Sequence, residues 1–321
     1  MRATLTGGVL IISITLSTLV MAIEPDTSLF KPLPKQVEQK DTVAVAQKVT
    51  LGKRLFLDTQ LSENNSISCN SCHNLKTFGV DNEARSPGTK GQLGDRNSPS
   101  VYNSALHIAQ FWDGRAKDVE EQALGPVLNP KEMAMPSEKV VLERLSSDPT
   151  YLEQFKAAFP NEAQPITFVN VGKAIGAFER TLLTPSRFDQ YLEGDKSALT
   201  EQEKAGLQKF SETGCTACHN GVLLGANAYQ KFGLVKPYVE ANPEDHGRMA
   251  VTKNAAEDMF FKVPSLRNIE KTGPYFHDGS IATLDQAVDV MAEYQLGKKL
   301  SKEEITSIVT FLRSLTGKLP Q

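Results

Sequence analysis

The sequence predicts a mainly α-helical fold built from two similar halves, and three observations support this prediction. The chain has 321 residues, of which 40% are hydrophobic and 23% charged, so it is long enough for two globular domains of roughly 150 residues each. Apolar residues recur at helical spacing in several segments, whereas the alternation typical of strands is not convincing anywhere. The pentapeptide Cys-x-x-Cys-His occurs twice, about one domain apart.

The first 22 residues have the features of an export signal. Arg2 stands near the start, an apolar stretch follows over 9–20, and Val20 and Ala22 suit a cleavage site. An uncleaved anchor is the alternative, but an apolar run of about a dozen residues is short for a membrane span of about 20. We therefore expect cleavage after Ala22.

One helix is predicted before the first pentapeptide and two after it. Residues 25–34 are punctuated by prolines and should be extended, whereas residues 43–57 have helical periodicity. Residues 78–103 are rich in Gly, Pro, Asn and Ser, so we expect a long irregular loop there. Segments 137–159 and 168–183 again have helical periodicity.

A helix followed by a pentapeptide recurs in the second half. Residues 200–210 are predicted to form an amphipathic helix, with Glu203 suited to a capping box behind Thr200. The last helix should begin after a Ser301 cap, because apolar residues then repeat at helical spacing.

The repeat divides the exported chain into two domains. A boundary near Thr184-Pro185-Ser186 gives domains 23–185 and 186–321. Lys and Arg number 35 and Asp and Glu 38, a formal net charge of -3. A chain with no global basic field is not drawn to nucleic acid or to an anionic membrane, so we expect neither a nucleic-acid partner nor a stable membrane anchor.

Both pentapeptides match the attachment signature of c-type haem. Two thiols one helical turn apart add to the two vinyl groups of one porphyrin, and the adjacent imidazole reaches the iron. The motifs use all four cysteines, so none is left for a disulfide. The expected haem-binding residues are Cys69, Cys72 and His73 in the first motif and Cys215, Cys218 and His219 in the second.

Two other chemistries also use paired cysteines. A dithiol redox pair is disfavoured because no thioredoxin-like βαβ pattern surrounds either motif. A tetrahedral zinc site would need the two pairs to come together, which a separation of about one domain makes awkward.

The residue opposite each histidine decides what each iron does. Met291, shortly before the last helix, is the expected sixth ligand of the second haem, and its thioether would raise the potential. His246, His277, Met249 and Met259 are its rivals. For the first haem two alternatives stay open. Ligation by Met133 or Met135 gives an electron relay, whereas a free Glu132 over an open iron gives an acid-base catalyst for peroxide.

The chain resembles the bacterial dihaem cytochrome c peroxidases from about residue 51 to residue 315. The resemblance implies two fused cytochrome c-type domains in a periplasmic homodimer. It also implies reduction of H2O2 to water with electrons from a small soluble cytochrome c or a blue-copper protein. The matching motifs are CNSCHN, GVDN, RNSP, QFWDGR, EEQALGPV, the EM of Glu132-Met133, VPSLRNI and TGPYFHDGS.

The resemblance also implies roles for single residues. The haem on His219 and Met291 would be the high-potential site of electron entry, and the haem on His73 the peroxide site. Glu132 would be the distal acid-base group, with Gln122 in the same pocket. Trp112 would bridge the haems, although a lone core tryptophan is the simpler explanation of that residue by itself.

A calcium site and a structural histidine follow from the same resemblance. Asn97 and the backbone carbonyls of Thr272 and Pro274 would hold a Ca2+ ion between the domains, as hard oxygen ligands. His277 would be structural, near the interdomain contact.

One position departs from the family pattern. Members commonly carry a histidine that caps the first iron in the oxidised enzyme, but here Ser86-Pro87-Gly88 is followed by Thr89. A threonine hydroxyl is a poor iron ligand, so our hypothesis is that this iron is open even when both haems are oxidised. His107 is the one nearby histidine that could substitute.

Two rival functions remain. A plain dihaem electron carrier would use Met133 or Met135 on the first iron. A related dihaem group oxidises tryptophans of a partner protein and has a tyrosine in place of the axial methionine. Met291 argues against that group, although Tyr294 stands only three residues away.

Overall fold

The computed structural model describes residues 24–40, 42–239 and 243–320. The expected export signal lies outside these residues and stays a prediction. Within them the fold is mainly helical, as predicted, and the only strands are two of three residues each, β1 and β2, which pair antiparallel. No helix of the described chain is long and apolar enough to cross a bilayer.

The elements follow the predicted order. Residues 78–103 contain neither helix nor strand, as expected. The helices and strands are α1 (Val45–Leu57), α2 (Cys69–Cys72), α3 (Val119–Gln122), α4 (Gly125–Leu128), α5 (Glu138–Ser147), α6 (Pro149–Ala158), α7 (Phe168–Glu179), α8 (Arg187–Leu192), α9 (Glu201–Thr213), β1 (Tyr229–Lys231), α10 (Met249–Thr252), β2 (Phe260–Lys262), α11 (Leu284–Val290) and α12 (Lys302–Arg313).

The segment predicted to be helical over 137–159 is two helices rather than one. Asp148 ends α5 and its side chain accepts a hydrogen bond from the backbone N–H of Thr150, which caps α6. Pro149 has no N–H to continue the first helix but is well suited to the first position of the next. The chain therefore breaks at a residue pair that also starts a new helix.

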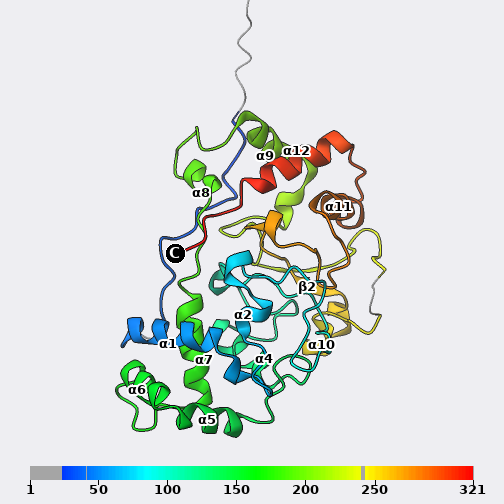
Figure 1. Ribbon diagram of the computed structural model, residues 1–321. Coiled ribbons are helices and arrows are strands. Elements are labelled where there is room, and N and C mark those ends of the chain that lie inside the picture. Colours follow the sequence, from blue (N-terminus) through cyan, green and yellow to red (C-terminus); the bar gives the residue numbers. More distant parts are fainter. Residues whose placement is uncertain (1–23, 41, 240–242, 321) are drawn as a thin grey trace, which may run out of the picture.

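Each half is organised around a pair of crossing helices. In the lower half of Figure 1, α1 crosses α7, and in the upper half α9 lies against α12. At each crossing the backbones of the two helices approach closely at a glycine. A Cβ on Gly52 would lie 1.8 Å from the backbone oxygen of Ala174, and one on Gly206 would lie 2.2 Å from that of Ser307. Only glycine permits this backbone approach.

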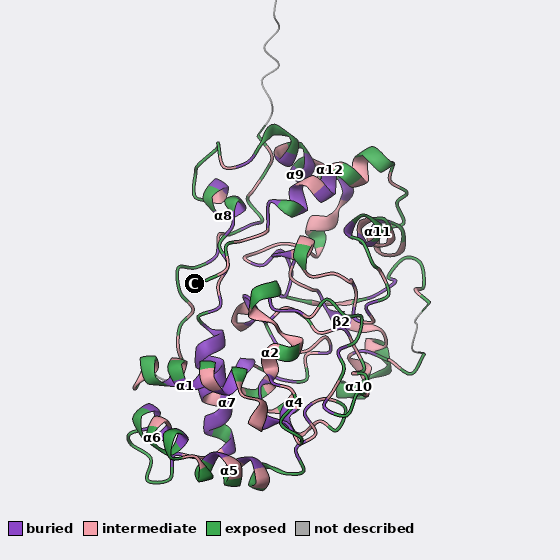
Figure 2. Ribbon diagram, viewed as in Figure 1, coloured by how far each residue is buried: buried purple, intermediate pink, exposed green. Residues whose placement is uncertain are grey.

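The buried apolar residues form two main clusters. The first takes its members from 51–182, among them five residues of α7, which is buried along most of its length and largely purple in Figure 2. The second takes its members from 188–315, together with Phe30. The predicted boundary at 185/186 falls between these ranges.

Each end of the described chain packs against the half that is distant from it in sequence. The backbone N–H of Leu33 donates to Asp189 at 2.7 Å, and Phe30 packs edge-on to Phe188 at 5.6 Å. At the other end, Leu319 packs against the first cluster. The segment before α1 therefore covers the second half, and the segment after α12 covers the first half.

Candidate active site

A large cavity surrounds the first pentapeptide. Its volume is about 650 Å³, and Cys69, Cys72 and His73 all line it. The Nδ1 atom of His73 lies 3.0 Å from the backbone oxygen of Pro99, to which a neutral imidazole donates. This bond leaves Nε2 as the atom with a free lone pair for a metal.

The second pentapeptide faces two adjoining cavities, which together we call the second cavity. Their volumes are about 160 and 90 Å³, and both are lined by Cys215, His219 and Met291. His219 Nδ1 lies 2.9 Å from the backbone oxygen of Leu224, so its Nε2 is also left available. Met291 begins a π-helical turn, Met291–Gln295, that follows α11. A histidine and a thioether sulfur therefore share this cavity.

The donor set of both cavities fits covalently attached haem. All four cysteines are free thiols. Burial raises the pKa of the Cys69 thiol to about 12 and that of Cys215 to about 12. Burial also lowers the pKa of His73 and His219, which keeps both imidazoles neutral as iron ligation requires. Free thiols and neutral imidazoles are the groups that c-type haem attachment and iron ligation use.

A carboxylate and an amide from outside the pentapeptide also line the first cavity. Glu132 follows α4, and Gln122 is the last residue of α3. Asn129 Nδ2 donates to Glu132 Oε1 at 2.8 Å, which orients the carboxylate. Burial raises the pKa of Glu132, against the smaller opposing effects of Arg115 and Asn129. A carboxyl group with a raised pKa is suited to acid-base work near neutral pH.

One wall is common to both cavities. Trp112 and Lys262 line the first cavity and both parts of the second. The indole Nε1 of Trp112 donates to the backbone oxygen of Asn97 at 2.8 Å, and its own backbone oxygen accepts from the N–H of Lys262 at 2.7 Å. The buried ring of His277 lies edge-on to Trp112 at 6.2 Å and stacks on Phe261 at 4.0 Å. Trp112 is thus held between the two cavities.

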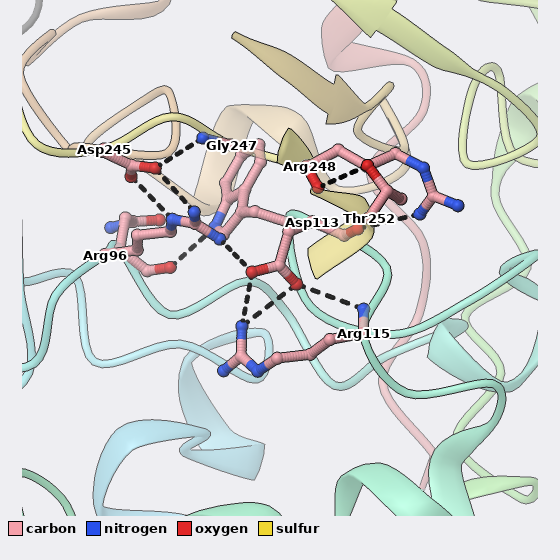
Figure 3. Close-up of polar contacts among 9 residues, drawn as sticks. Arg96, Asp113, Arg115, Asp245, Gly247, Arg248 and Thr252 are labelled. Atoms are coloured by element: carbon pink, nitrogen blue, oxygen red, sulfur yellow. Dashed lines mark hydrogen bonds and ion pairs between the residues drawn. The ribbon is translucent and has the colours of Figure 1, made fainter. Parts of the chain in front are cut away.

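An arginine cluster ties the two halves together beside this wall (Figure 3). Arg96 donates to Asp245 through Nε at 2.7 Å and Nη2 at 2.6 Å, and to Asp113 through Nη1 at 2.7 Å. Arg115 also pairs with Asp113, and Arg248 donates to the backbone oxygen of Asp113 at 3.0 Å. Contacts of this bidentate kind fix orientation as well as distance.

The chain is similar to a known protein family and to several named proteins. A family profile described as di-haem cytochrome c peroxidase matches residues 46–197. The cytochrome c551 peroxidase of Nitrosomonas europaea is 51% identical over 276 residues, which cover 86% of this chain and 81% of that protein. The chain belongs to the di-haem cytochrome c peroxidase family. As a member of this family it has two haems.

Other named proteins and a solved structure are also similar to this di-haem peroxidase chain. The cytochrome c551 peroxidase of Pseudomonas aeruginosa is 48% identical, with 92% of this chain and 86% of that protein covered. The methylamine utilization protein MauG of Methylorubrum extorquens is 37% identical over 76% of this chain and 68% of its own length. Among solved structures, a MauG-like protein associated with microbial copper homeostasis superposes with a TM-score of 0.76 at 28% identity, covering 95% of this chain and 96% of that one.

Of the rivals of Met291 in the di-haem fold, His277 alone also lines the second cavity. His246 lines the first cavity and pairs with Asp258 at 2.8 Å, and His277 lines the second within its aromatic stack. Met249 and Met259 line none of the described cavities. Among the methionines considered, Met291 therefore shares a cavity with His219, whereas Met249 and Met259 do not.

Two of the candidates around the first haem, Glu132 and Met133, line the first cavity. Met133 lines the first cavity, but it is buried in the first apolar cluster together with Met135. Thr89 is not among the described residues that line this cavity. Its backbone N–H donates to the oxygen of Glu132 at 2.8 Å, and its backbone oxygen accepts from Asn64. The loop that bears Thr89 is therefore attached to the segment that bears Glu132.

The residues expected to hold calcium line the same cavity. Asn97, Thr272 and Pro274 all line the larger part of the second cavity. Asn97 Nδ2 donates to the backbone oxygen of Glu83 at 2.9 Å, which leaves its Oδ1 as a candidate ligand. Within the described ranges no cluster of three or more His, Cys, Asp or Glu residues could hold a metal, so such a site would depend on neutral oxygens.

Sequence reasoning missed two features of the site. Lys262 was not singled out, although a lysine flanked by Phe260, Phe261 and Val263 is a visible signal of unusual burial. The salt-bridge cluster of Arg96 was missed as well. Its carboxylates come from residues distant in sequence, and nothing local marks them as partners.

Proposed function

We propose that this protein is a periplasmic dihaem cytochrome c peroxidase that reduces H2O2 to water with electrons from a small soluble cytochrome c or a blue-copper protein. The proposal rests on the observation that different side chains line the two cavities beside their histidines. Met291 shares the second with His219, whereas Glu132 and Gln122 share the first with His73. One haem site is thus equipped for electron transfer and the other for acid-base chemistry.

The haems, when bound, supply the redox chemistry and connect the electron donor to peroxide. Around them, the chain's own residues orient peroxide and move its protons. Glu132 takes a proton from one peroxide oxygen and returns it to the other, so that water can leave. Asn129 holds Oε1 of this carboxylate, and Gln122 supplies a second polar group in the cavity. The full reaction consumes two electrons from the donor and two protons, and yields two waters.

Electron entry is proposed at the second haem, with Trp112 between the two sites. Trp112 lines both cavities, its indole Nε1 donates to the backbone oxygen of Asn97, and its backbone oxygen accepts from the N–H of Lys262 in β2. A rigid aromatic group in this position lowers the reorganisation that accompanies electron transfer. His73 and His219 would each ligate one haem iron, and Met291 would be a second protein ligand of the iron that His219 binds.

We propose that the first iron is open when both haems are oxidised. Thr89 is held by Asn64 and by the backbone of Glu132, and is buried away from the lining of the cavity. His107 Nδ1 accepts from the Lys262 ammonium at 2.9 Å. A neutral imidazole that accepts at Nδ1 has its proton on Nε2 and so lacks a lone pair for iron.

Electron paramagnetic resonance of the oxidised protein tests the open site. We expect a high-spin signal from the first haem. A low-spin signal typical of two histidines would contradict the open site and make His107 the ligand. His107→Gln, measured under the same conditions, would then convert that signal to high spin.

Calcium and self-association complete the proposal. Asn97, Thr272 and Pro274 would bind Ca2+ between the two halves, and the protein would act as a homodimer. Chelation followed by calcium titration tests the ion, with haem spectra and sedimentation as readouts. Unchanged spectra and mass after chelation would contradict the site.

Peroxide turnover with a reduced small cytochrome c tests the function as a whole. We expect turnover, which a plain electron carrier lacks. The related enzymes that oxidise tryptophans on a partner are disfavoured because Met291, rather than Tyr294, lines the second cavity. The Tyr294 ring instead packs against Tyr238 at 5.5 Å and under the Lys236 ammonium.

A further inference from the structure

Lys262 is an ammonium group buried in the wall between the two haem cavities. It is the last residue of β2, only 5% of its surface is exposed, and it lines both cavities. Its Nζ donates to His107 Nδ1 at 2.9 Å and to the backbone oxygen of Ala109 at 2.8 Å. Both acceptors are neutral. A buried charge without a counter-charge is costly, and burial accordingly lowers the pKa of Lys262 to about 7.

The other cations that line these cavities already have carboxylate partners. Lys262 forms no ion pair with any carboxylate of the described chain, and the nearby Asp113 is already paired with Arg96 and Arg115. The paired cations are Arg96 with Asp113 and Asp245, Arg115 with Asp113, Lys131 with Asp95, and Arg267 with Asp189. Lys262 is thus the one lining cation whose charge the described protein leaves uncompensated.

The neighbouring residue His107 also has a polar atom without a partner among the described residues. His107 Nδ1 accepts from Lys262, so the neutral ring has its remaining proton on Nε2. That Nε2 atom is buried and has no hydrogen-bond partner among the described residues. Lys262 and His107 together form a buried site rich in donors and lacking an anion, and both line the two cavities.

We propose that the Lys262 ammonium is the counter-charge of a haem propionate at the wall between the two cavities. Each haem brings two propionate carboxylates, and an ammonium has three N–H donors, of which the protein uses two. The third donor binds the propionate, and His107 holds the ammonium in place. Lys262 is a positioning residue, because it acts on the haem through its propionate.

The inference rests on the presence of haem in the two cavities, and it does not depend on peroxide reduction. A positive charge beside a propionate offsets the negative charge that stabilises oxidised iron. Removing it should therefore lower the midpoint potential of the haem concerned. The two haems are the two possible sources of the propionate, and their potentials distinguish them.

The test is a spectroelectrochemical titration of the dihaem protein and of Lys262→Met. We expect the ratio of reduced to oxidised haem, at a fixed potential, to fall at least tenfold for one haem, which is 59 mV for one electron. A fall confined to the Met291 haem assigns the propionate to that haem, and a fall confined to the other assigns it there. Lys131→Met is the matched control, because Lys131 lines the first cavity but is half-exposed and paired with Asp95.

Two further variants separate charge from packing. Lys262→Arg keeps the charge and should keep both potentials within a threefold change of that ratio. If Lys262→Met does not accumulate with two haems, Lys262→Gln is titrated instead, and the same fall is expected because the amide is uncharged. Potentials that change no more than in Lys131→Met would overturn the proposal, as would Lys262→Arg behaving like Lys262→Met. Peroxide turnover is recorded separately, so unchanged potentials with normal turnover would refute this role of Lys262 and leave the peroxidase intact.

Discussion

Replacing Glu132 with glutamine should remove most of the peroxide turnover and leave both haem sites intact. The side chain keeps its size and can still accept from Asn129, which donates to Oε1 at 2.8 Å. What the variant loses is a group that takes up and returns a proton. The cavity around it, including the residues that hold the first haem, is otherwise unchanged.

The expected loss follows from the surroundings of the carboxylate. Burial raises the pKa of Glu132, so its basicity is closer to working pH than that of an ordinary glutamate. Proton transfer by a positioned group of this kind contributes roughly 10²- to 10⁴-fold, which corresponds to about 3 to 5 kcal/mol of activation free energy. We expect a fall in kcat within this range.

The assay is steady-state oxidation of a reduced small cytochrome c by H2O2, recorded as a function of pH. Glu132 must be ionised to accept a proton, so activity should fall as the pH drops through the raised pKa, and this acidic limb should be absent from Glu132→Gln. Asp95→Asn is the control: Asp95 lines the same cavity but is largely exposed, so the acidic limb should persist, displaced only to lower pH because the Asp95 charge raises the pKa of Glu132. Unchanged turnover in Glu132→Gln, with normal haem spectra, would refute the role of Glu132.

Three other variants test other parts of the structure. Asn129→Ala removes a hydrogen bond that lowers the pKa of Glu132, so the acidic limb of activity should move to higher pH; a limb that stays in place would contradict this. Met291→Ala should lower the potential of the second haem in a redox titration, because a thioether ligand favours the reduced iron; an unchanged potential would remove Met291 as a ligand. Asp245→Asn breaks a largely buried pair with Arg96 and should cost about 3 kcal/mol in chemical unfolding, whereas a cost below about 1 kcal/mol would be typical of an exposed pair.

Local sequence signals were reliable wherever a few neighbouring residues decide the structure. The capping box of Thr200 and Glu203 was predicted and is present at the start of α9, and the Ser301 cap is present at the start of α12. The break at Asp148 was missed because helical periodicity continues through it, although Pro149 is a local signal that could have been used.

Contacts between segments that are distant in sequence could not be predicted from local sequence signals. The glycine at each helix crossing is explained only by the backbone that it meets, Ala174 for Gly52 and Ser307 for Gly206. The pairing of Lys262 with His107 joins residues 155 positions apart. The packing of the whole chain brings such partners together, and no local sequence pattern indicates which residues they are.

The sequence alone determined that this protein attaches two c-type haems, because the attachment chemistry is contained in five consecutive residues. It also determined the mainly helical fold, through periodicity and caps. Only the tertiary structure decided which residues share a cavity with each histidine: Met291 with His219, and Glu132 and Gln122 with His73. It also placed Trp112 and Lys262 in the wall between the cavities. The physical reason is that ligand orientation and charge compensation depend on distances between segments, and these are set by packing of the whole chain.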